Sequence, residues 1–547
     1  MKFSKLTLAI AATLSVSASF SAVAMDLYVD TKTKQIFAEP GRGRELMGSF
    51  QKVDDAPAKT VAPAAPAAEI SAMKQDLELK TNEIKALQEH AAEATKPDSV
   101  HVKLDDGIHF ATKDGNFTAG INGRMQVDSQ SNINQQLQSS FFNNTGISNQ
   151  LNDGATLRRA RLGVEGTFFK NYGYKLEYDF TRGANTAGGI TDAYISYAFS
   201  KPFNVRFGAF KEPFSMEEAT SNRYTTFIER NMATNAFVDN LNTYKVGAGA
   251  FYAQDRWQAA TSFQTEGIGQ YSNAYGTSTT QSNFNAPSRS GGSGDTSWEV
   301  NARVTGLPWM ESKTKFLHVG TSGSYININN NYNGNNSFNN GGLIFASTVN
   351  SNVDRTAILN TGNLTSGNKG AATSLQANHV FRFGAESALV YGPFSAQAEY
   401  IQADVSGNGY NSNNNLSGYY GYMTYFLTGE SRNYKSKTGA WDRIKPNRNF
   451  DMKGGWGAWE LAAGYDAIDL NSKAIQGGKA STVKFGLNWY PISHVRVMTD
   501  YVHILDINTQ NAQSPSVNGN SGTVNTVAQG WNNGQLDMIE SRIQLDW

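Results

Sequence analysis

From about residue 100 to the C-terminus, the chain alternates apolar and polar side chains with a period of two. In the last segment, one set of alternate positions holds Ile539, Ser541, Ile543, Leu545 and Trp547. The positions between them hold charged or amide side chains. Successive side chains of a β-strand point to opposite faces, so this strand has one apolar and one charged face. A membrane barrel needs this arrangement, because one face contacts lipid and the other a wet lumen.

Other segments repeat the alternation and carry aromatic residues near their ends. They span residues 159–168, 174–180, 459–466 and 483–489. Tyrosine and tryptophan concentrate at the two interfaces of a membrane, where the ring is buried and the polar atom reaches water. The pattern therefore predicts strands that cross a bilayer.

The connections between these strands alternate between short and long. The short ones lie near 169–173, 200–204, 254–256, 307–313, 392–393 and 491–494. The long ones lie at 129–153, 211–243, 266–295, 328–374 and 506–534. Short periplasmic turns and long external loops are the rule for outer-membrane barrels. The alternation predicts an all-β fold, a sixteen-stranded antiparallel transmembrane β-barrel over residues 100–547, with periplasmic termini and one long periplasmic connection at 428–455.

A soluble all-β array, such as a propeller or an adhesin repeat, is the alternative interpretation of the same pattern. The sequence has no fixed internal repeat, and the aromatic Trp547 at the C-terminus favours the membrane interpretation. A barrel of sixteen strands is wide enough to leave an aqueous channel.

The first 24 residues have the pattern of a secretory signal peptide. Lys2 and Lys5 precede a mostly apolar run at 6–16, and small residues at 22–24 suit a cleavage site. The apolar run is too short for a spanning helix, which needs about 18 residues or more. We expect cleavage after Ala24 and export of the remaining chain.

Residues 25–95 form a separate N-terminal region. A short mixed segment at 25–55 leads into an Ala/Pro-rich stretch at 56–68, which is typical of an extended linker; we assign residues 25–68 to the periplasm. Apolar residues then recur at 3–4 spacing over residues 69–95, with Lys80 as the one break. This spacing predicts a short periplasmic coiled-coil helix beside a larger trimer, and a single solvated helix is the alternative.

The composition fits a barrel better than a soluble exported enzyme. Aromatic residues make up 12% of the chain, glycine 52 residues, and cysteine none, so no disulfide can stabilise it. The mean hydropathy is −0.45, which is polar for a membrane protein. A β-barrel explains that value, because only alternate residues contact lipid.

Charge and chemistry exclude several other functions. Removing Lys2 and Lys5 leaves 45 basic and 47 acidic residues, a net charge of about −2, which argues against nucleic acid as a partner. The seven histidines are scattered, and no Ser/His/Asp constellation is present. We therefore expect no catalytic residues, no metal site, no cofactor and no enzyme activity.

Several motifs resemble one known family, the phosphate-selective porins O and P. They are LRRARLGVEG at 157–166, the run at 210–230, YFLTGE at 425–430, GAWEL at 457–461 and the run at 486–501. The resemblance covers about residues 105–547, with the motifs in the same order. The coiled-coil segment lies outside it.

This resemblance implies a trimeric sixteen-stranded barrel whose third external loop, 211–243, folds into the lumen and narrows it. It also implies that arginines at the constriction replace the hydration of an oxyanion. By motif match, and with the cations of that loop, the implied anion-binding or constriction residues are Arg124, Arg158, Arg159, Arg161, Asp192, Lys211, Arg223 and Arg230.

The arginines at 158, 159 and 161 can also be considered from strand geometry. They cannot all face lipid, because an arginine at the midplane costs roughly 2–4 kcal/mol there. Arg158 falls on the apolar parity, so it must lie near a rim, snorkel, or follow a bulge. Arginine suits phosphate because its planar fork of donors matches two oxygens. The alternative is that these arginines pair with lumen carboxylates such as Glu165 and Glu177.

The sequence departs from the phosphate-specific pattern in ways that favour weak selectivity. Glu218 stands where such members carry lysine, and loop 211–243 is net acidic. The region 328–374 holds only Arg355 and Lys369 as basic residues. Conversely, Arg161 and Lys211 stand where those members have aromatic residues.

We therefore expect an outer-membrane diffusion channel with a weak preference for anions such as phosphate. A structural or adhesive protein that uses the barrel as an anchor is the alternative. The expected partners are small anionic solutes, outer-membrane lipid and lipopolysaccharide, and two further copies of the chain in a homotrimer.

Overall fold

The computed structural model describes most of the chain beyond the predicted signal peptide, which lies outside the described residues. The described residues are 25–30, 36–37, 39, 41, 44–50, 67–93, 100–104, 107–137, 150–181, 189–239, 244–267, 297–328, 343–366, 375–410, 414–512 and 526–547. The chain divides into two compact units, residues 1–91 and residues 92–547.

The first unit contains a small sheet and most of a long helix. Strand β1 (Met25–Asp30) pairs antiparallel with β2 (Ile36–Phe37) and with β3 (Arg44–Phe50), a sheet that the sequence analysis did not predict. Helix α2 (Ala67–Glu93) occupies the segment predicted as a coiled coil. Leu77, Leu87 and the other described side chains between residues 74 and 89 are exposed. Association of α2 with other copies stays a prediction.

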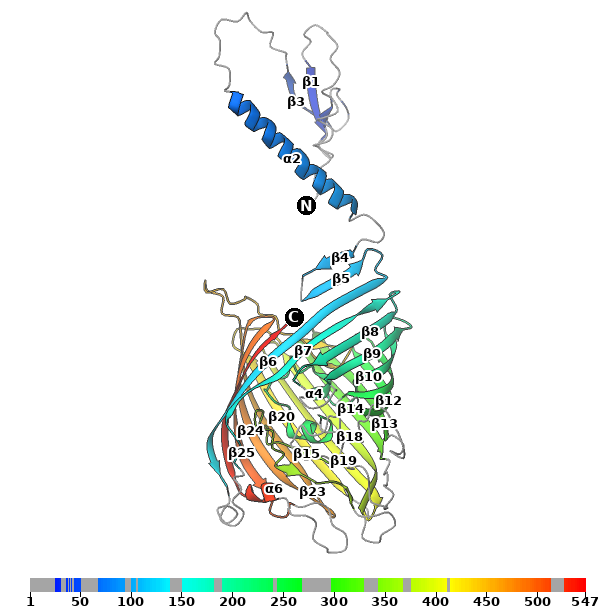
Figure 1. The fold of residues 1–547 in the computed structure, drawn as a ribbon, viewed down its shortest axis with the longest axis vertical. Coiled ribbons are helices and arrows are strands. Elements are labelled where there is room, and N and C mark those ends of the chain that lie inside the picture. The colour runs from blue at the N-terminus through cyan, green and yellow to red at the C-terminus, as the bar shows by residue number, and fades with distance from the viewer. Residues whose placement is uncertain are drawn as a thin grey trace, which may run out of the picture. The chain divides into compact units, whose positions relative to one another are not determined.

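The second unit is a closed antiparallel barrel of sixteen spanning strands, which confirms the predicted fold (Figure 1). The spanning strands are β6 (Phe117–Gln136), β7 (Gly154–Phe168), β8 (Tyr172–Asp179), β9 (Ile190–Ala198), β10 (Phe203–Lys211), β11 (Tyr244–Ala253), β12 (Trp257–Gly267), β13 (Trp298–Ser312), β14 (Lys315–Asn327), β18 (Leu375–Tyr391), β19 (Phe394–Asn408), β20 (Asn415–Phe426), β23 (Ala458–Ser472), β24 (Ile475–Ile492), β25 (Val495–Asn508) and β26 (Gln535–Asp546). The ring closes where β26 pairs with β6.

The alternation along the strands places apolar side chains outside and polar side chains in the lumen. In β26, Ile539, Ile543 and Leu545 are exposed on the outer wall, whereas Glu540 and Arg542 are buried inside. The predicted alternation of the other four segments is also present in β7, β8, β23 and β24. Among the described helices, none is long and apolar enough to cross a membrane.

The connections follow the predicted alternation of short turns and long loops, with three differences. Strand β6 runs to Gln136, so the predicted loop at 129–153 begins later; its last residues pair with β26 and remain a strand although they are polar. Pro308 lies within β13 at a bulge, so the turn to β14 is shorter than the predicted 307–313. Proline cannot donate to a ladder, and a bulge accommodates it. Three further connections, 180–189, 409–414 and 473–474, were not among those predicted, and the last is short although it lies on the side of the long loops.

A short hairpin of β4 (Val100–Lys103) and β5 (Ile108–Thr112) precedes the first spanning strand, and it was also not predicted. Strand β5 pairs with the start of β6, from Ile108 opposite Ile121 to Ala111 opposite Thr118. It therefore extends the barrel wall on the side of the short turns, which we call the turn side.

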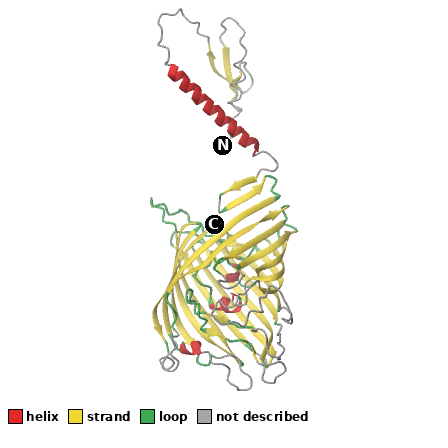
Figure 2. Cartoon of the chain, viewed as in Figure 1, coloured by secondary structure: helices red, strands yellow, loops and turns green. Residues whose placement is uncertain are grey.

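Among the described residues, three connections supply most of the chain that folds into the lumen. The first, 212–239, contains α4 (Met216–Ala219) and α5 (Met232–Phe237). The second, 343–366, contains β15 (Ala346–Ser347), β16 (Leu359–Asn360) and β17 (Thr365–Ser366). The third, 427–457, enters from the turn side and contains β21 (Tyr434–Lys435) and β22 (Ala440–Trp441). Figure 2 shows helices of the first connection inside the ring of strands.

An apolar core forms where these connections meet the wall. Phe237, Phe345, Val349 and Ile358 are almost completely buried and belong to one cluster with side chains of the wall. The last long connection contains α6 (Thr526–Gly530), next to which Trp531 joins the same cluster. The middle of the barrel is therefore packed with folded chain, and any path for a solute runs beside it.

Candidate permeation pathway

Charged side chains of the wall hold loop 212–239 in place. Glu399 on β19 accepts hydrogen bonds from the hydroxyl of Ser215 at 2.9 Å and from the backbone N–H of Met216. Asp500 on β25 accepts from the N–H of Ile228 at 2.6 Å. A loop without regular structure has backbone groups that need partners once water is excluded, and these carboxylates supply them.

Arginines of the wall do the same for the carbonyl groups of the loop. Arg496 donates to the carbonyl of Thr225 at 2.6 Å, Arg542 to that of Ile228 at 2.8 Å, and Arg382 to that of Phe237 at 2.7 Å. These three arginines were absent from the predicted site. Their alternating position in each strand indicates that they face the lumen, but the sequence carries no signal for their partners.

Arg158 reaches the lumen through a β-bulge. Gln126 of β6 pairs with Arg159, and the next residue of β6 pairs with Leu157, so Arg158 is the extra residue of β7. Its guanidinium donates to Glu229 of the loop at 2.9 Å and to Asn352 at 3.1 Å. Sequence alternation left three possibilities for Arg158, namely a rim position, snorkelling or a bulge, and the structure contains the bulge.

Arg124 and Arg161 share one carboxylate. Arg124 lies 2.7 Å from Glu177, and Arg161 lies 2.9 Å from the other oxygen of Glu177 and 2.8 Å from Asp179. Tyr244 accepts a further hydrogen bond from Arg161 at 3.0 Å. These two arginines follow the alternative interpretation, in which they pair with carboxylates of the lumen.

Arg159 has a different environment from its neighbours. It is 6% exposed and donates to the side-chain oxygen of Gln126 at 3.0 Å. Its Nε has no hydrogen-bond partner, and within the described part of the chain no carboxylate forms an ion pair with it. Among the predicted arginines, Arg159 is therefore the one whose charge is not neutralised by direct contact.

Lys211 and Arg230 are joined by Glu218. Lys211 is in ion-pair contact with one oxygen of Glu218, and Arg230 lies 3.1 Å from the other and 3.3 Å from Asp239. Burial raises the pKa of Glu218 to about 7, and the nearby Asp239 carboxylate adds to the effect, whereas the Arg230 guanidinium opposes it. Glu218 is thus a loop carboxyl that gains a proton near neutral pH.

The remaining predicted residues lie elsewhere in the lumen. Arg223 donates to Asn122 and to the carbonyl of Gly123, both at 3.3 Å, and lies 3.7 Å from Asp546. Asp192 on β9 forms an ion pair with Lys175 at 3.2 Å. The predicted residues are therefore not an open ring of cations: Arg124, Arg159 and Arg161 lie on adjacent pairs of β6 and β7, and the others contact partners of their own.

Further cations of the lumen were not predicted as site residues. Arg303 pairs with Glu386, Lys245 with Glu212 and Glu299, Arg432 with Glu460, and Lys484 with Asp466. Each contacts a carboxylate on another element, so each cancels a charge rather than adding one.

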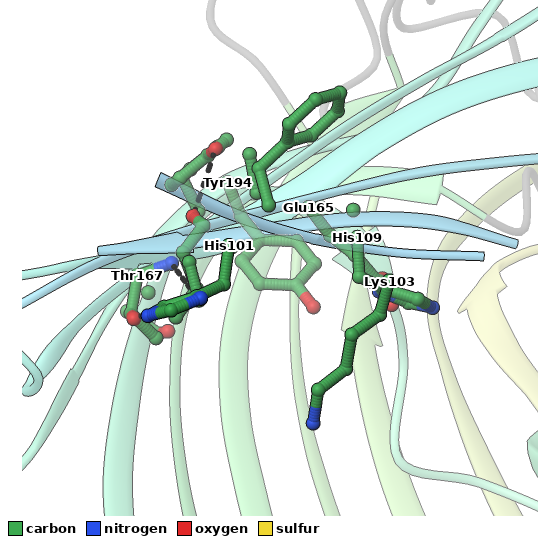
Figure 3. A pocket seen from close by; sticks show the side chains of 15 residues that line it. His101, Lys103, His109, Glu165, Thr167 and Tyr194 are labelled. Atoms are coloured by element: carbon green, nitrogen blue, oxygen red, sulfur yellow. Dashed lines mark hydrogen bonds between the residues drawn. The ribbon is translucent and has the colours of Figure 1, made fainter. Parts of the chain in front are cut away.

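The turn-side mouth of the lumen contains a cavity of about 550 Å³ beneath the hairpin of β4 and β5 (Figure 3). His109 lies opposite both Gly120 and Lys103 in the sheet, so these residues share one face. His101 and Lys103 line the cavity from the hairpin, and Glu165 and Tyr194 line it from the wall.

Two further cations stand close to this mouth. Lys175 is 23% exposed and pairs with Asp192. The guanidinium of Arg206 lies 4.3 Å from the ring centre of Tyr194 and 4.4 Å from that of Phe251. Such stacking holds a guanidinium without cancelling its charge. Among the described residues, no group of three or more histidine or carboxylate side chains is placed to hold a metal ion.

The chain is similar in sequence to one described family of porins. The sequence model of the family described as phosphate-selective porin O and P matches residues 132–527. Porin O of Pseudomonas aeruginosa is 28% identical over 425 residues, which cover 73% of this chain and 86% of that protein. An uncharacterized protein of Caulobacter vibrioides is 27% identical over 445 residues, 81% of this chain and 78% of that protein.

Solved structures with a similar arrangement include outer-membrane proteins. OmpT of Vibrio cholerae has a TM-score of 0.42 at 11% identity, covering 80% of this chain and 100% of its own. An anion-selective porin from Comamonas acidovorans has a TM-score of 0.41 at 11% identity, covering 79% of this chain and 100% of its own.

Proposed function

The chain belongs to the family of phosphate-selective porins O and P and is a channel of the bacterial outer membrane, and from this premise we propose that it is a passive diffusion channel with a weak preference for oxyanions such as phosphate. The observation that carries the proposal is Arg159, a lumen guanidinium without an ion-pair partner among the described residues. An unneutralised cation attracts anions, and its planar donors suit a phosphate oxygen pair.

The pairing of the other cations supports a weak preference rather than tight binding. Arg124, Arg161 and Arg230 each contact carboxylates, so they contribute little net charge. Holding a partly dehydrated oxyanion would require several unneutralised donors around one point. Lys175 and Lys211 are also paired, with Asp192 and Glu218, so Arg159 attracts anions without such a cage around it.

The orientation and assembly of the channel are part of the proposal. The turn side faces the periplasm and the long loops face outward, as the length of the connections favours. Residues 25–95 then lie in the periplasm. The barrels form a homotrimer surrounded by outer-membrane lipid and lipopolysaccharide.

Planar-bilayer reversal potentials in a salt gradient test the selectivity. We expect a modest anion preference in the parent, and a shift toward cations in Arg159→Glu. The control is Arg161→Gln with Asp179→Asn, which removes a paired cation together with its carboxylate; the lumen charge is then unchanged, so the shift should be smaller. Equal shifts in the two variants would show that Arg159 does not set the preference.

Phosphate block of the chloride current tests the strength of binding. The parent should be blocked only at high phosphate concentration, and Glu218→Lys should strengthen the block because it adds a cation beside Arg230. Block of the parent by micromolar phosphate would overturn the proposal of weak selectivity.

One observation favours the second candidate, a barrel that serves as a structural or adhesive anchor. Gln126, Asp128 and Gln130 face the lumen from β6 but are 0%, 1% and 3% exposed, so that side of the lumen is filled. A closed barrel would give no steady current in the same bilayers, and this result would favour the anchor.

A further inference from the structure

The connection 427–457 passes from the lumen to the outer surface of the barrel. Its first part lies inside: the indole of Trp441 donates to Gln397 on the lumen face of β19, and Arg443 lies 2.6 Å from Asp546. Figure 1 shows the connection projecting, in orange-yellow, at the end of the barrel where β4 and β5 lie.

The second part packs on the outer wall. The backbone N–H of Phe450 donates to the carbonyl of Pro491 at 2.8 Å, and its ring lies 5.3 Å from that of Trp489. The indoles of Trp459 and Trp489 donate to the carbonyl of Trp456 at 3.1 Å and 2.9 Å. Trp459 and Trp489 share the parity of Leu461 and Leu487, which point to lipid. Residues 446–457 therefore cover the lipid-facing ends of β23 and β24.

This part presents large apolar side chains outward. Met452 is 87% exposed and Trp456 is 71% exposed. A tight turn positions Met452, because Asp451 accepts hydrogen bonds from the N–H groups of Lys453 at 2.7 Å and Gly455 at 2.8 Å. A methionine at the tip of an ordered turn, next to an exposed indole, is unfavourable in water and favourable at a membrane interface.

Basic side chains flank these apolar tips. Residues 446–457 carry two basic side chains, Arg448 and Lys453, and a single acidic one, Asp451, which pairs with Arg448 at 3.2 Å. The Arg448 side chain is nevertheless 61% exposed, so most of its donors remain accessible. The segment thus combines an apolar tip with net positive charge, as interfacial membrane anchors do.

We propose that residues 446–457 form a membrane foot, which inserts Met452 and Trp456 into the turn-side leaflet and contacts phospholipid phosphates through Arg448 and Lys453. The foot continues the ring of aromatic side chains that Tyr425 and Trp459 begin on the same wall. The proposal of a membrane foot rests on the outer-membrane location of the barrel and not on its ion selectivity. A result that contradicts the anion preference would therefore leave the foot unaffected, and the reverse also holds.

Single-cysteine labelling tests the foot, because the chain has no cysteine of its own. Met452→Cys and Lys437→Cys are each labelled with an environment-sensitive fluorophore in the full-length barrel, reconstituted in vesicles of phosphatidylcholine with phosphatidylglycerol. Lys437 is the matched control, since it is exposed in the first part of the same connection. Both sites are exposed, and folding is verified for each by heat-modifiable migration.

Lipids that carry a spin label near the headgroup should quench the probe at 452 several-fold more strongly than the probe at 437. Aqueous iodide should show the reverse order. Quenching at 452 by iodide alone would overturn the foot, because the tip would then lie in water. Protection of 452 from both quenchers would also overturn it, because a second copy of the chain would then cover the site.

The charge of the foot is tested separately. Arg448→Glu with Lys453→Glu, in the Met452→Cys background, should lower the lipid quenching in vesicles with phosphatidylglycerol several-fold more than in phosphatidylcholine alone. An equal change in both kinds of vesicle would show that Arg448 and Lys453 do not contact the phospholipid phosphates. Reversal potentials should stay those of the parent in these variants, which separates the foot from the channel.

Discussion

Arg158 and Arg159 are adjacent in sequence, yet the bulge in β7 gives them the same face and different partners. The parity of the strand shows that Arg158 departs from a regular ladder. It does not show that Glu229 and Asn352, which lie 71 and 194 residues away in sequence, receive its hydrogen bonds. Strand parity therefore predicts that Arg159 and Arg161 face the lumen, but not that the bulge brings Arg158 there too, and the pairing of Arg158 depends on contacts between distant segments.

Glu218 should make the anion preference depend on pH. Its pKa is raised to about 7, so the carboxyl is charged at pH 8 and mostly neutral at pH 6. Lys211 and Arg230 then lose one neutralising partner as the pH falls. We expect the preference for chloride over potassium to rise between pH 8 and pH 6, measured as reversal potential.

Glu218→Gln is the control for this pH effect and should show high anion preference at both pH values. His101 and His109, which line the cavity at the turn-side mouth, are the other candidates for a pH response. The parent and the His101→Asn, His109→Asn variant are therefore compared. A pH response that survives Glu218→Gln and disappears in the histidine variant would assign the effect to the mouth instead.

Loop 212–239 illustrates what the sequence indicates at the scale of an element. Its bounds follow from the alternation of strands, and its inward fold was expected from the resemblance to porins alone. Its anchors were not predicted, because Glu399 and Asp500 lie on strands far along the chain. Charge alternation in a strand indicates a polar face but not which backbone group that face binds.

Glu399→Ala should loosen the start of this loop. The variant removes the acceptor for Ser215 and Met216, and a buried donor left without a partner costs roughly 1–3 kcal/mol. We expect larger and noisier single-channel conductance, because the loop no longer holds its position. Glu311→Ala, which breaks an exposed pair with Lys315, should leave the conductance unchanged. Unchanged traces for Glu399→Ala would show that other anchors suffice.

Helix α2 should be dispensable for assembly of the barrel. Its described apolar side chains, such as Leu77 and Leu87, are exposed, and barrels of this size usually associate through their walls. Deleting residues 69–95 should therefore leave a heat-modifiable trimer on gels. Folded monomers as the only product would show that the helix is the main support of the trimer.

At the scale of the whole molecule, the period-two pattern is enough to predict the closed barrel and most of its connections. It misses the features that lack this period: the sheet of β1 to β3, the hairpin of β4 and β5, and the path of 427–457. The connection 428–455 was predicted as long, but nothing in its sequence indicates that Trp441 enters the lumen while Trp456 stays outside.

Trp547 should matter for building the barrel more than for conduction. Its backbone N–H donates to the carbonyl of Gly123 at 3.1 Å, and its indole lies over the same glycine, so that it completes the seam between β26 and β6. We expect Trp547→Ser to lower the amount of folded protein in outer membranes, with single-channel conductance near that of the parent. Trp547→Phe keeps an aromatic ring and should assemble better; normal assembly of the serine variant would contradict the role.

The anchors of loop 212–239 also impose an order in time. Asp500 and Arg542, which bind Ile228, follow it by 272 and 314 residues, on the last two strands. The loop is therefore fully anchored only in a barrel that already contains β25 and β26, so the channel reaches its narrowed form once the wall of strands is complete.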